Sequence, residues 1–296
     1  MSEQNAERIL HFPPFEGSLA EIAHIKRGAE VMRSGQALVV DNDCVWAVWG
    51  NPEDPRFLKE VERLKGRDPN RPYGLTISTA QFLELADLDR VDPSVRPLLE
   101  DAEELAARLG AMTFIRMPGK QTKIVEWGMP ASLVSRDDKN YPVVQNYDSA
   151  GKADVAQLLE LARQDGPGGK GIRFPAVTSL NRTAQSEIIE PEEAITFSRE
   201  FSLPVIADEQ AKRCGTGSYA IIEFNEQGMC LLREGNISND LLRRLLHPYP
   251  LHISPEVKKA KGEPFDGSGI PELKGLVGAE LRIALLHHFG WDRCPK

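Results

Sequence analysis

The chain has 296 residues, which is enough for one large or two modest domains with buried cores. Its formal net charge of −8 gives no support to a large nucleic-acid-binding face, although a local basic cleft remains compatible with it. The amino terminus lacks the cationic and apolar regions of a secretory signal, and no apolar run approaches the roughly 18 residues of a membrane span. Four scattered cysteines show neither disulfide nor zinc spacing. These features predict a cytoplasmic globular protein without a membrane partner.

The first half of the chain alternates between helical and extended patterns. Residues 1–17 are expected to form an amino-terminal arm. Ser18 and Glu21 form a capping-box pattern that predicts the start of a helix closing at Gly35. Pro55 predicts the start of another helix, which ends near Gly66. Two more helices are expected across 80–109, and strands are expected at 37–40, up to Trp49, at 72–78, at 112–117, at 123–127 and at 142–147.

The second half continues this alternation. Asp148 or Ser149 is expected to cap a helix ending near Arg163, and a glycine-rich loop follows. Strands are predicted at 174–179, 204–207, 219–224 and 229–233, the last two as a hairpin. Helices between strands predict an α/β fold with a twisted mixed sheet, here over residues 18–245. Residues 246–296 are expected to form a carboxy-terminal extension with an irregular arm over 247–275 and a terminal helix over 278–289.

Two short polar motifs are candidates for binding phosphate. Lys65 and Arg67 follow the predicted helix from Pro55, where cations are favoured by the helix dipole, so they fit a solvated helix end. They also fit a phosphate clamp, because an arginine fork and a mobile lysine charge are complementary tools for a triphosphate.

The second motif is Thr178, Ser179 and Asn181, at the end of a predicted strand. Small hydroxyl and amide donors at a strand end suit a ligand in a crevice. The same residue types also favour a polar turn, so both interpretations stay open. The sequence shows no metal-ligand spacing, and we expect no metal held by the protein alone.

Together, in this order, these motifs resemble the KxR and SxN signatures of the YrdC-like threonylcarbamoyl-adenylate synthase family. Further landmarks follow the family order: residues 117–122 resemble its PGPxT turn, Ser218 lies where the family has the serine of its STV strand, and residues 232–235 resemble its LRxG ending. The chain is thus similar to a divergent member of this family, and the resemblance implies the YrdC-like fold.

The resemblance also implies an activity. Enzymes of this family are nucleotidyltransferases that combine threonine, bicarbonate and ATP into threonylcarbamoyl-adenylate and release pyrophosphate, with Mg²⁺ accompanying the nucleotide. The product serves tRNA modification to threonylcarbamoyladenosine, so tRNA or a downstream transferase is an implied partner. Lys65 and Arg67 would be catalytic, and the nucleotide would be bound by Thr178, Ser179, Asn181, Ser218 and Arg233.

The sequence departs from the family at its amino-acid-binding side. The proline-threonine-acid-threonine loop of the family corresponds here to Val40-Asp41-Asn42-Asp43, and Asp41 and Asp43 become candidates for binding the acceptor. An aspartate would repel the carboxylate of threonine and attract a cationic acceptor. The arginine expected in the strand at 142–147 appears as Gln145 or Asn146, and Tyr219 replaces the STV threonine.

Three functions remain open on these residues. The first is threonylcarbamoyl-adenylate synthesis, and the second is synthesis of a related carbamoyl-type adenylate on another amino acid or amine. The third is a non-catalytic module of YrdC-like fold that binds nucleotide or RNA. The retained phosphate-side residues favour catalysis, and the changed loop at 40–43 favours a different acceptor.

Overall fold

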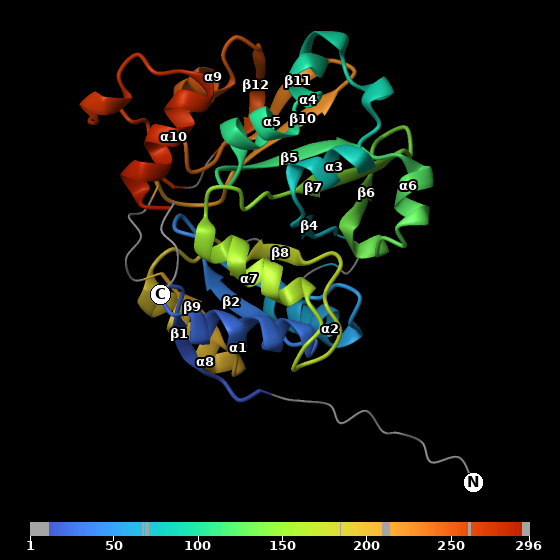
Figure 1. The fold of residues 1–296 in the computed structure, drawn as a ribbon, viewed down its shortest axis with the longest axis vertical. Coiled ribbons are helices and arrows are strands. Elements are labelled where there is room, and N and C mark those ends of the chain that lie inside the picture. Colours follow the sequence, from blue (N-terminus) through green and yellow to red (C-terminus); the bar gives the residue numbers. More distant parts are fainter. Residues whose placement is uncertain are drawn as a thin grey trace.

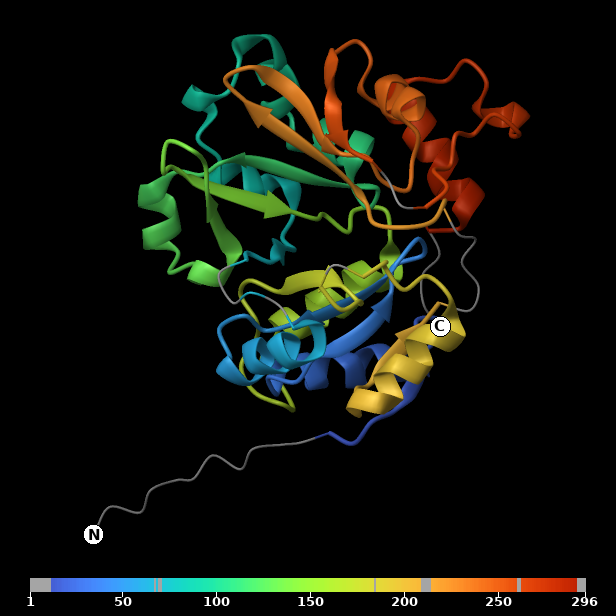
Figure 2. The same ribbon diagram turned by 180° about the vertical axis from the view of Figure 1, so that it is seen from behind.

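A large twisted sheet flanked by helices makes up the protein (Figures 1 and 2). The computed structural model describes residues 12–66, 68, 71–183, 185–208, 214–259 and 262–291. Arg67, one of the two residues of the expected phosphate clamp, lies outside the described residues. The sequence-based expectation of a mixed α/β fold is confirmed.

The sheet has the strand order β1-β9-β2-β3-β8-β4-β7-β5-β10-β11-β12, and β6 pairs with β7 outside this path. Its pairs are both parallel and antiparallel: β2 and β3 are antiparallel, whereas β5 and β10 are parallel. The strands are β1 (Glu16–Ser18), β2 (Leu38–Asp41), β3 (Trp46–Gly50), β4 (Gly74–Leu75), β5 (Thr113–Pro118), β6 (Val134–Arg136), β7 (Pro142–Asn146), β8 (Ala176–Ser179), β9 (Val205–Ala207), β10 (Ala220–Asn225), β11 (Gly228–Arg233) and β12 (Leu251–Lys258).

Helices cover both faces of the sheet. In Figure 1, α1 and α7 lie side by side in front of the half that contains β2, and α5, α9 and α10 gather at the other half. Figure 2 shows α2 on the reverse side. The helices are α1 (Ile22–Arg33), α2 (Pro55–Lys65), α3 (Thr79–Leu85), α4 (Arg96–Leu99), α5 (Ala102–Leu109), α6 (Gln121–Glu126), α7 (Ala153–Arg163), α8 (Pro191–Phe201), α9 (Asn239–Leu246) and α10 (Gly278–Phe289), with 3₁₀ turns at Leu88–Arg90, Pro93–Val95, Ala131–Leu133 and Pro271–Leu273.

Successive side chains of a strand point to opposite faces of the sheet. Because helices cover both faces, the side chains of the central strands are buried on each side. Val39 and Val48 pack in one apolar cluster with Phe57 of α2, whereas Leu38 and Val40 pack in a second cluster with α1 and α7. This explains why the runs at 37–40 and up to Trp49 are almost wholly apolar. No helix among the described residues is long and apolar enough to cross a membrane.

Several local expectations are confirmed. The helix α2 begins at Pro55, its amino terminus is capped by the Asp54 side chain, and it ends at Gly66 in the left-handed conformation. The strands β10 and β11 form the expected antiparallel hairpin, and α10 spans the predicted 278–289.

The capping-box prediction at Ser18 is wrong. Ser18 belongs to β1, where it pairs with Ala207 of β9, and α1 begins only at Ile22 without a side-chain cap. The strand predicted at 123–127 is also wrong. Residues of this run form α6, which lies off the sheet and buries Ile124 while Val125 is 69% exposed. Short apolar runs are ambiguous between helix and strand until tertiary packing decides.

Three further expectations need correction. The helix α7 begins at Ala153, because the carboxylate of Asp148 instead accepts a hydrogen bond from the backbone of Thr79. The second helix expected before residue 109 is broken where Asp101 caps the start of α5. The expected irregular arm at 247–275 contains β12, which pairs in parallel with β11. The helices α8 and α9 were not predicted.

Candidate functional site

A cavity of about 530 Å³ opens over the middle of the sheet. Its wall is built from the loop after β2, the end of α2, and strands from β3 across β8, β4, β7, β5, β10 and β11 to β12. This volume lies within the usual range of about 300–1,000 Å³ for small-molecule sites. The cavity is therefore large enough to hold a nucleotide.

Lys65 joins the two polar motifs that are far apart in the sequence. Its side chain is 6% exposed, and its ammonium donates to the backbone oxygens of Ser179 and Asn181, the latter at 2.8 Å. It also donates to Asn181 Oδ1 at 3.1 Å, and the Ser179 hydroxyl donates to the same oxygen at 2.6 Å. Thr178 lines the same wall. Lys65, Ser179 and Asn181 thus form one hydrogen-bonded unit at the cavity.

Ser218 and Arg233 lie on the same cavity. The Arg233 guanidinium donates to the backbone oxygen of Tyr219 at 2.6 Å, and burial lowers the pKa of Arg233, which Glu187 opposes. The Ser218 hydroxyl donates to Glu187 at 2.8 Å. The phenol of Tyr219 donates to the backbone oxygen of Asn42 at 2.6 Å. The bulky ring at position 219 therefore braces the loop after β2.

The described part of the cavity wall is rich in cations. Its charged side chains are Lys65, Arg71, Arg116, Arg233, Lys258 and, as the single carboxylate, Glu187. Cations in a partly desolvated cavity attract anions more strongly than they would in bulk water. This cavity is thus suited to a phosphate or carboxylate ligand, although the chain as a whole is acidic.

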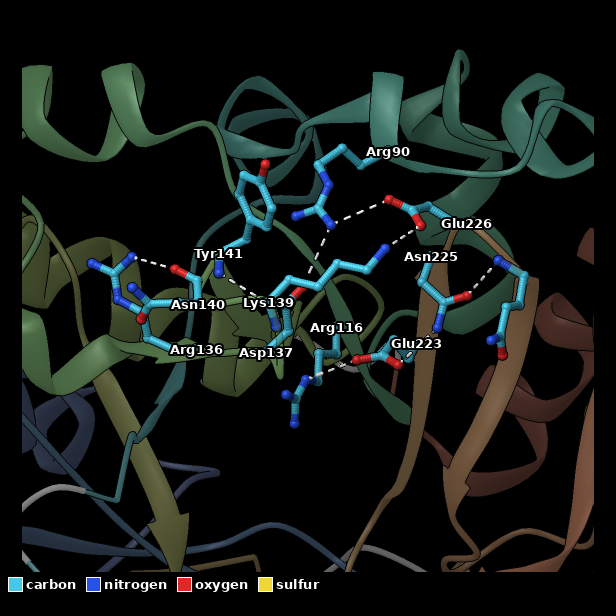
Figure 3. Close-up of polar contacts among 11 residues, drawn as sticks. Arg90, Arg116, Arg136, Asp137, Lys139, Asn140, Tyr141, Glu223, Asn225 and Glu226 are labelled. Carbon is cyan, nitrogen blue, oxygen red and sulfur yellow. Dashed lines mark hydrogen bonds and ion pairs between the residues drawn. The ribbon is translucent and has the colours of Figure 1, made fainter.

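Arg116 lies in the cavity wall, on strand β5, which pairs with β10. It stands opposite Glu223 on the neighbouring strand β10, and its Nε lies 3.0 Å from a Glu223 carboxylate oxygen. Figure 3 shows this pair beside a second network in which Glu226 binds Arg90 and Lys139 at the tip of the β10–β11 hairpin. Glu223 therefore orients Arg116 while the hairpin tip is held separately.

Asp41, the last residue of β2, and the four residues that lead from it to β3 form a turn that we call the 41–45 loop. Asn42 and Val45 line the cavity. Asp43 instead forms an ion pair with Lys152, with 2.7 Å between Asp43 Oδ2 and Lys152 Nζ, and the Asp41 carboxylate accepts the backbone N–H of Asp43 at 3.0 Å. Both aspartates are buried. The structure thus presents the residue between the two expected acceptor-binding aspartates to the cavity.

The two candidates for the missing family arginine have different environments. Gln145 lines the cavity. Asn146 is 1% exposed, and its side-chain amide makes two hydrogen bonds of 3.0 Å with the backbone of Ile77. Asn146 therefore ties β7 to the segment after β4, and Gln145 is the residue available to a ligand.

Sequence reasoning missed Arg71, Arg116, Lys258 and Glu187. For Arg116 a signal existed, since Phe114 and Arg116 alternate with buried residues along the predicted strand at 112–117. Lys258 gave no signal, because the segment that holds it was expected to be irregular.

The described residues of this cavity offer a divalent cation only partial ligation. Among the residues that the structure describes, no group of three or more histidine, cysteine or acidic side chains could hold a metal ion. Mg²⁺ commonly uses one or two carboxylates together with substrate phosphates. Glu187, beside Ser218, fits that limited role for a metal that arrives with the nucleotide.

Comparison with solved structures identifies the fold. Neither a family model nor a curated protein sequence matches the chain. Among solved structures, the chain is similar to a double-substituted variant of P. abyssi Sua5, with a TM-score of 0.56 and 18% identity over 81% of this chain. The complex of P. abyssi Sua5 with L-threonine gives a TM-score of 0.53 and 19% identity over 77% of this chain. The chain spans 65% and 58% of these two Sua5 chains.

The E. coli protein YciO is also similar, with a TM-score of 0.52 and 14% identity over 78% of this chain and 98% of YciO. The expected YrdC-like fold is therefore confirmed: the chain has the fold shared by Sua5 and YciO.

Proposed function

We propose that the protein catalyses ATP-dependent formation of a carbamoyl-type adenylate, from ATP, bicarbonate and an amino acid or amine, with release of pyrophosphate. The hydrogen-bonded unit of Lys65, Ser179 and Asn181 on a cation-lined cavity carries this proposal. The fold shared with Sua5, one structure of which is complexed with L-threonine, supports an amino acid as one class of acceptor.

The reaction divides into two steps. The neutral amine of the acceptor combines with bicarbonate to give a carbamate anion and water. A carbamate oxygen then attacks the α-phosphorus of ATP, and the bond from that phosphorus to the bridging oxygen of pyrophosphate breaks. Reactions of this kind depend mainly on positioning and on neutralisation of charge.

The residues of the cavity suit these requirements. Lys65, with Arg67 as its proposed partner, would neutralise phosphate and carbamate oxygens. Thr178, Ser179 and Asn181 would bind the nucleotide phosphates from the end of β8, and Ser218 with Arg233 would bind them from the opposite strands. Mg²⁺ bound with the nucleotide would supply further neutralisation, and Glu187 is the carboxylate placed to receive it.

The acceptor would bind at the 41–45 loop. Of Asp41, Asn42 and Asp43, only Asn42 lines the cavity. Asp41 and Asp43 would therefore act indirectly, by fixing the shape of the loop that carries Asn42. A downstream transferase or tRNA would then receive the activated carbamoyl group.

The experiment that tests this function is pyrophosphate release from ATP, Mg²⁺ and bicarbonate, measured with threonine and with a panel of other amino acids and amines. We expect release that requires both bicarbonate and an acceptor, together with a product of the corresponding adenylate mass. Binding of ATP without turnover on any acceptor would overturn the proposal and favour a non-catalytic nucleotide-binding module. Salt-dependent retention of RNA without turnover would favour an RNA-binding module.

A further inference from the structure

Asn42 has the properties of a ligand contact. Its side chain is 2% exposed, it lines the cavity, and its Oδ1 has no hydrogen-bond partner among the residues that the structure describes. An unpaired buried amide oxygen costs about 1–3 kcal/mol. Because this oxygen is itself buried, a ligand that donates an N–H or O–H would recover that free energy once the Asn42 amide turns toward the cavity.

The backbone of the 41–45 loop is fixed by hydrogen bonds on each side of Asn42. The N–H of Asn42 donates to Val45 at 3.1 Å, and its carbonyl oxygen accepts from Cys44 N–H at 2.8 Å and from the Tyr219 hydroxyl at 2.6 Å. Asp43 adopts a left-handed conformation with φ of 64°, which is uncommon for a residue other than glycine. Aspartate adopts this conformation more readily than most residues, and a side-chain contact that fixes Asp43 would hold the loop further.

Lys152 supplies that contact. It immediately precedes α7, and its ammonium lies 2.7 Å from Asp43 Oδ2, with both side chains 1% exposed. Burial alone would lower the pKa of Lys152, but the carboxylate of Asp43 outweighs burial and raises it. Burial in turn raises the pKa of Asp43 to about 7, against the opposing charge of Lys152. The 2.7 Å contact ties the loop to the amino terminus of α7.

Stability alone does not account for this pair. Replacing a buried ion pair with well-packed apolar side chains is often neutral or stabilising, whereas removing one partner strongly destabilises a protein. The Asp43–Lys152 ion pair is directional, whereas an apolar contact would not fix the orientation of the Asp43 side chain. The pair therefore suits a role in positioning the loop.

We propose that Lys152 is a positioning residue that holds the 41–45 loop through Asp43, and that Asn42 thereby presents its amide to the amine or hydroxyl of the acceptor. This inference rests on the proposed function for the identity of the bound molecule. The geometry of the loop itself does not depend on that function.

The test compares wild-type protein with Lys152→Met and with the double variant Asp43→Asn, Lys152→Met. The single variant leaves a buried carboxylate without its ammonium and is expected to lose stability. The double variant removes both charges, and asparagine tolerates the left-handed conformation at position 43. Stability is measured by urea denaturation, loop protection by hydrogen exchange of the segment 41–45, and function by the KM values for acceptor and ATP.

In the double variant we expect near-wild-type stability and unchanged exchange in β3 and β8, while the amides of the 41–45 loop exchange at least about tenfold faster. The acceptor KM should rise by about tenfold, since small misplacement of binding groups is costly, with the ATP KM and kcat nearly unchanged. If the double variant is stable and neither loop exchange nor acceptor KM changes, the positioning role is wrong.

The design separates this inference from the proposed function. If the wild-type protein turns over no acceptor, the proposed function fails, and loop exchange alone then decides whether Lys152 positions Asn42. If turnover occurs and only Lys152→Met is impaired while the double variant behaves as wild type, the ion pair serves stability and the inference is overturned.

Discussion

At the scale of single residues, the proposed site depends on Lys65. Its ammonium contacts oxygens of both Ser179 and Asn181, so one side chain connects the end of α2 with the end of β8. A lysine at a helix end was open to two interpretations in the sequence. Burial argues against the solvated helix end, because such a charge would not be 6% exposed with backbone acceptors around it, and the phosphate clamp stays a proposal.

We predict that Lys65→Met lowers acceptor-dependent pyrophosphate release by about 100-fold or more, comparable to the loss of one oxyanion-stabilising donor. Lys139→Met is the matched control, because Lys139 is 62% exposed and binds Glu226 at the hairpin tip, away from the cavity. Initial rates at saturating ATP, together with thermal denaturation of each variant, check this prediction. Equal rates for the two variants would mean that Lys65 takes no part in the reaction.

Asn42 allows a second prediction at this scale. Asn42→Ala should raise the acceptor KM by about tenfold or more, because a hydrogen bond to a charged amine contributes about 1.5–3 kcal/mol. The ATP dissociation constant, measured by calorimetry, should remain within about twofold of the wild-type value. A variant that loses ATP affinity and keeps its acceptor KM would place Asn42 on the nucleotide side.

At the scale of elements, α10 contacts the start of α7 and so supports the 41–45 loop indirectly. Trp291, directly after this helix, accepts the backbone N–H of Ala153 at 3.1 Å, and its ring lies 6.0 Å from the ammonium of Lys152. Arg282 of the same helix donates to the backbone of Gly110 at 3.0 Å. The terminal helix therefore packs against the start of α7, where Lys152 lies.

We predict that Trp291→Ala lowers the free energy of unfolding by about 3–5 kcal/mol, because it removes a large buried side chain and leaves a cavity. Ile283→Ala on the same helix is the control, since Ile283 is 51% exposed and should change stability by less than about 0.5 kcal/mol. Urea denaturation of both variants measures the difference. Similar losses in the two variants would contradict a specific supporting role for Trp291.

The elements also show what the sequence can predict. The helix α2 and the β10–β11 hairpin carry local signals, an Asp54–Pro55 start with a glycine end and a turn at residues 225–228, so their positions were predictable. The strand β12 is largely exposed and contains Pro255, and only its pairing with β11 identifies it as a strand. Non-local pairing of this kind leaves little trace in the local pattern.

At the scale of the whole molecule, the sheet brings together residues that are distant in the chain. Lys65 and Ser179 were found from short polar motifs and Arg233 from the family resemblance, and all three line one cavity. Arg116 and Lys258 reach the same cavity through the pairing of β5 with β10 and of β11 with β12. The sequence alone therefore indicated part of the charged wall, and the strand order supplied the rest.

The whole-molecule charge illustrates the same point. A net charge of −8 gave no support to a large nucleic-acid-binding face, and the described cavity wall holds five cations and one carboxylate. Because charges beyond about 10 Å are largely screened at physiological salt, the local set governs binding. The acidic net charge therefore does not argue against an anionic ligand at this site.

The most direct measurement of the proposed reaction uses ¹³C-labelled bicarbonate. The protein is incubated with ATP, Mg²⁺, labelled bicarbonate and each acceptor that supports pyrophosphate release, and the adenylate product is analysed by mass spectrometry. We predict one ¹³C atom in every adenylate formed, in the carbonyl that joins the acceptor nitrogen to AMP. An adenylate without the label would mean that the acceptor is activated directly, and this result would contradict carbamoyl-adenylate synthesis.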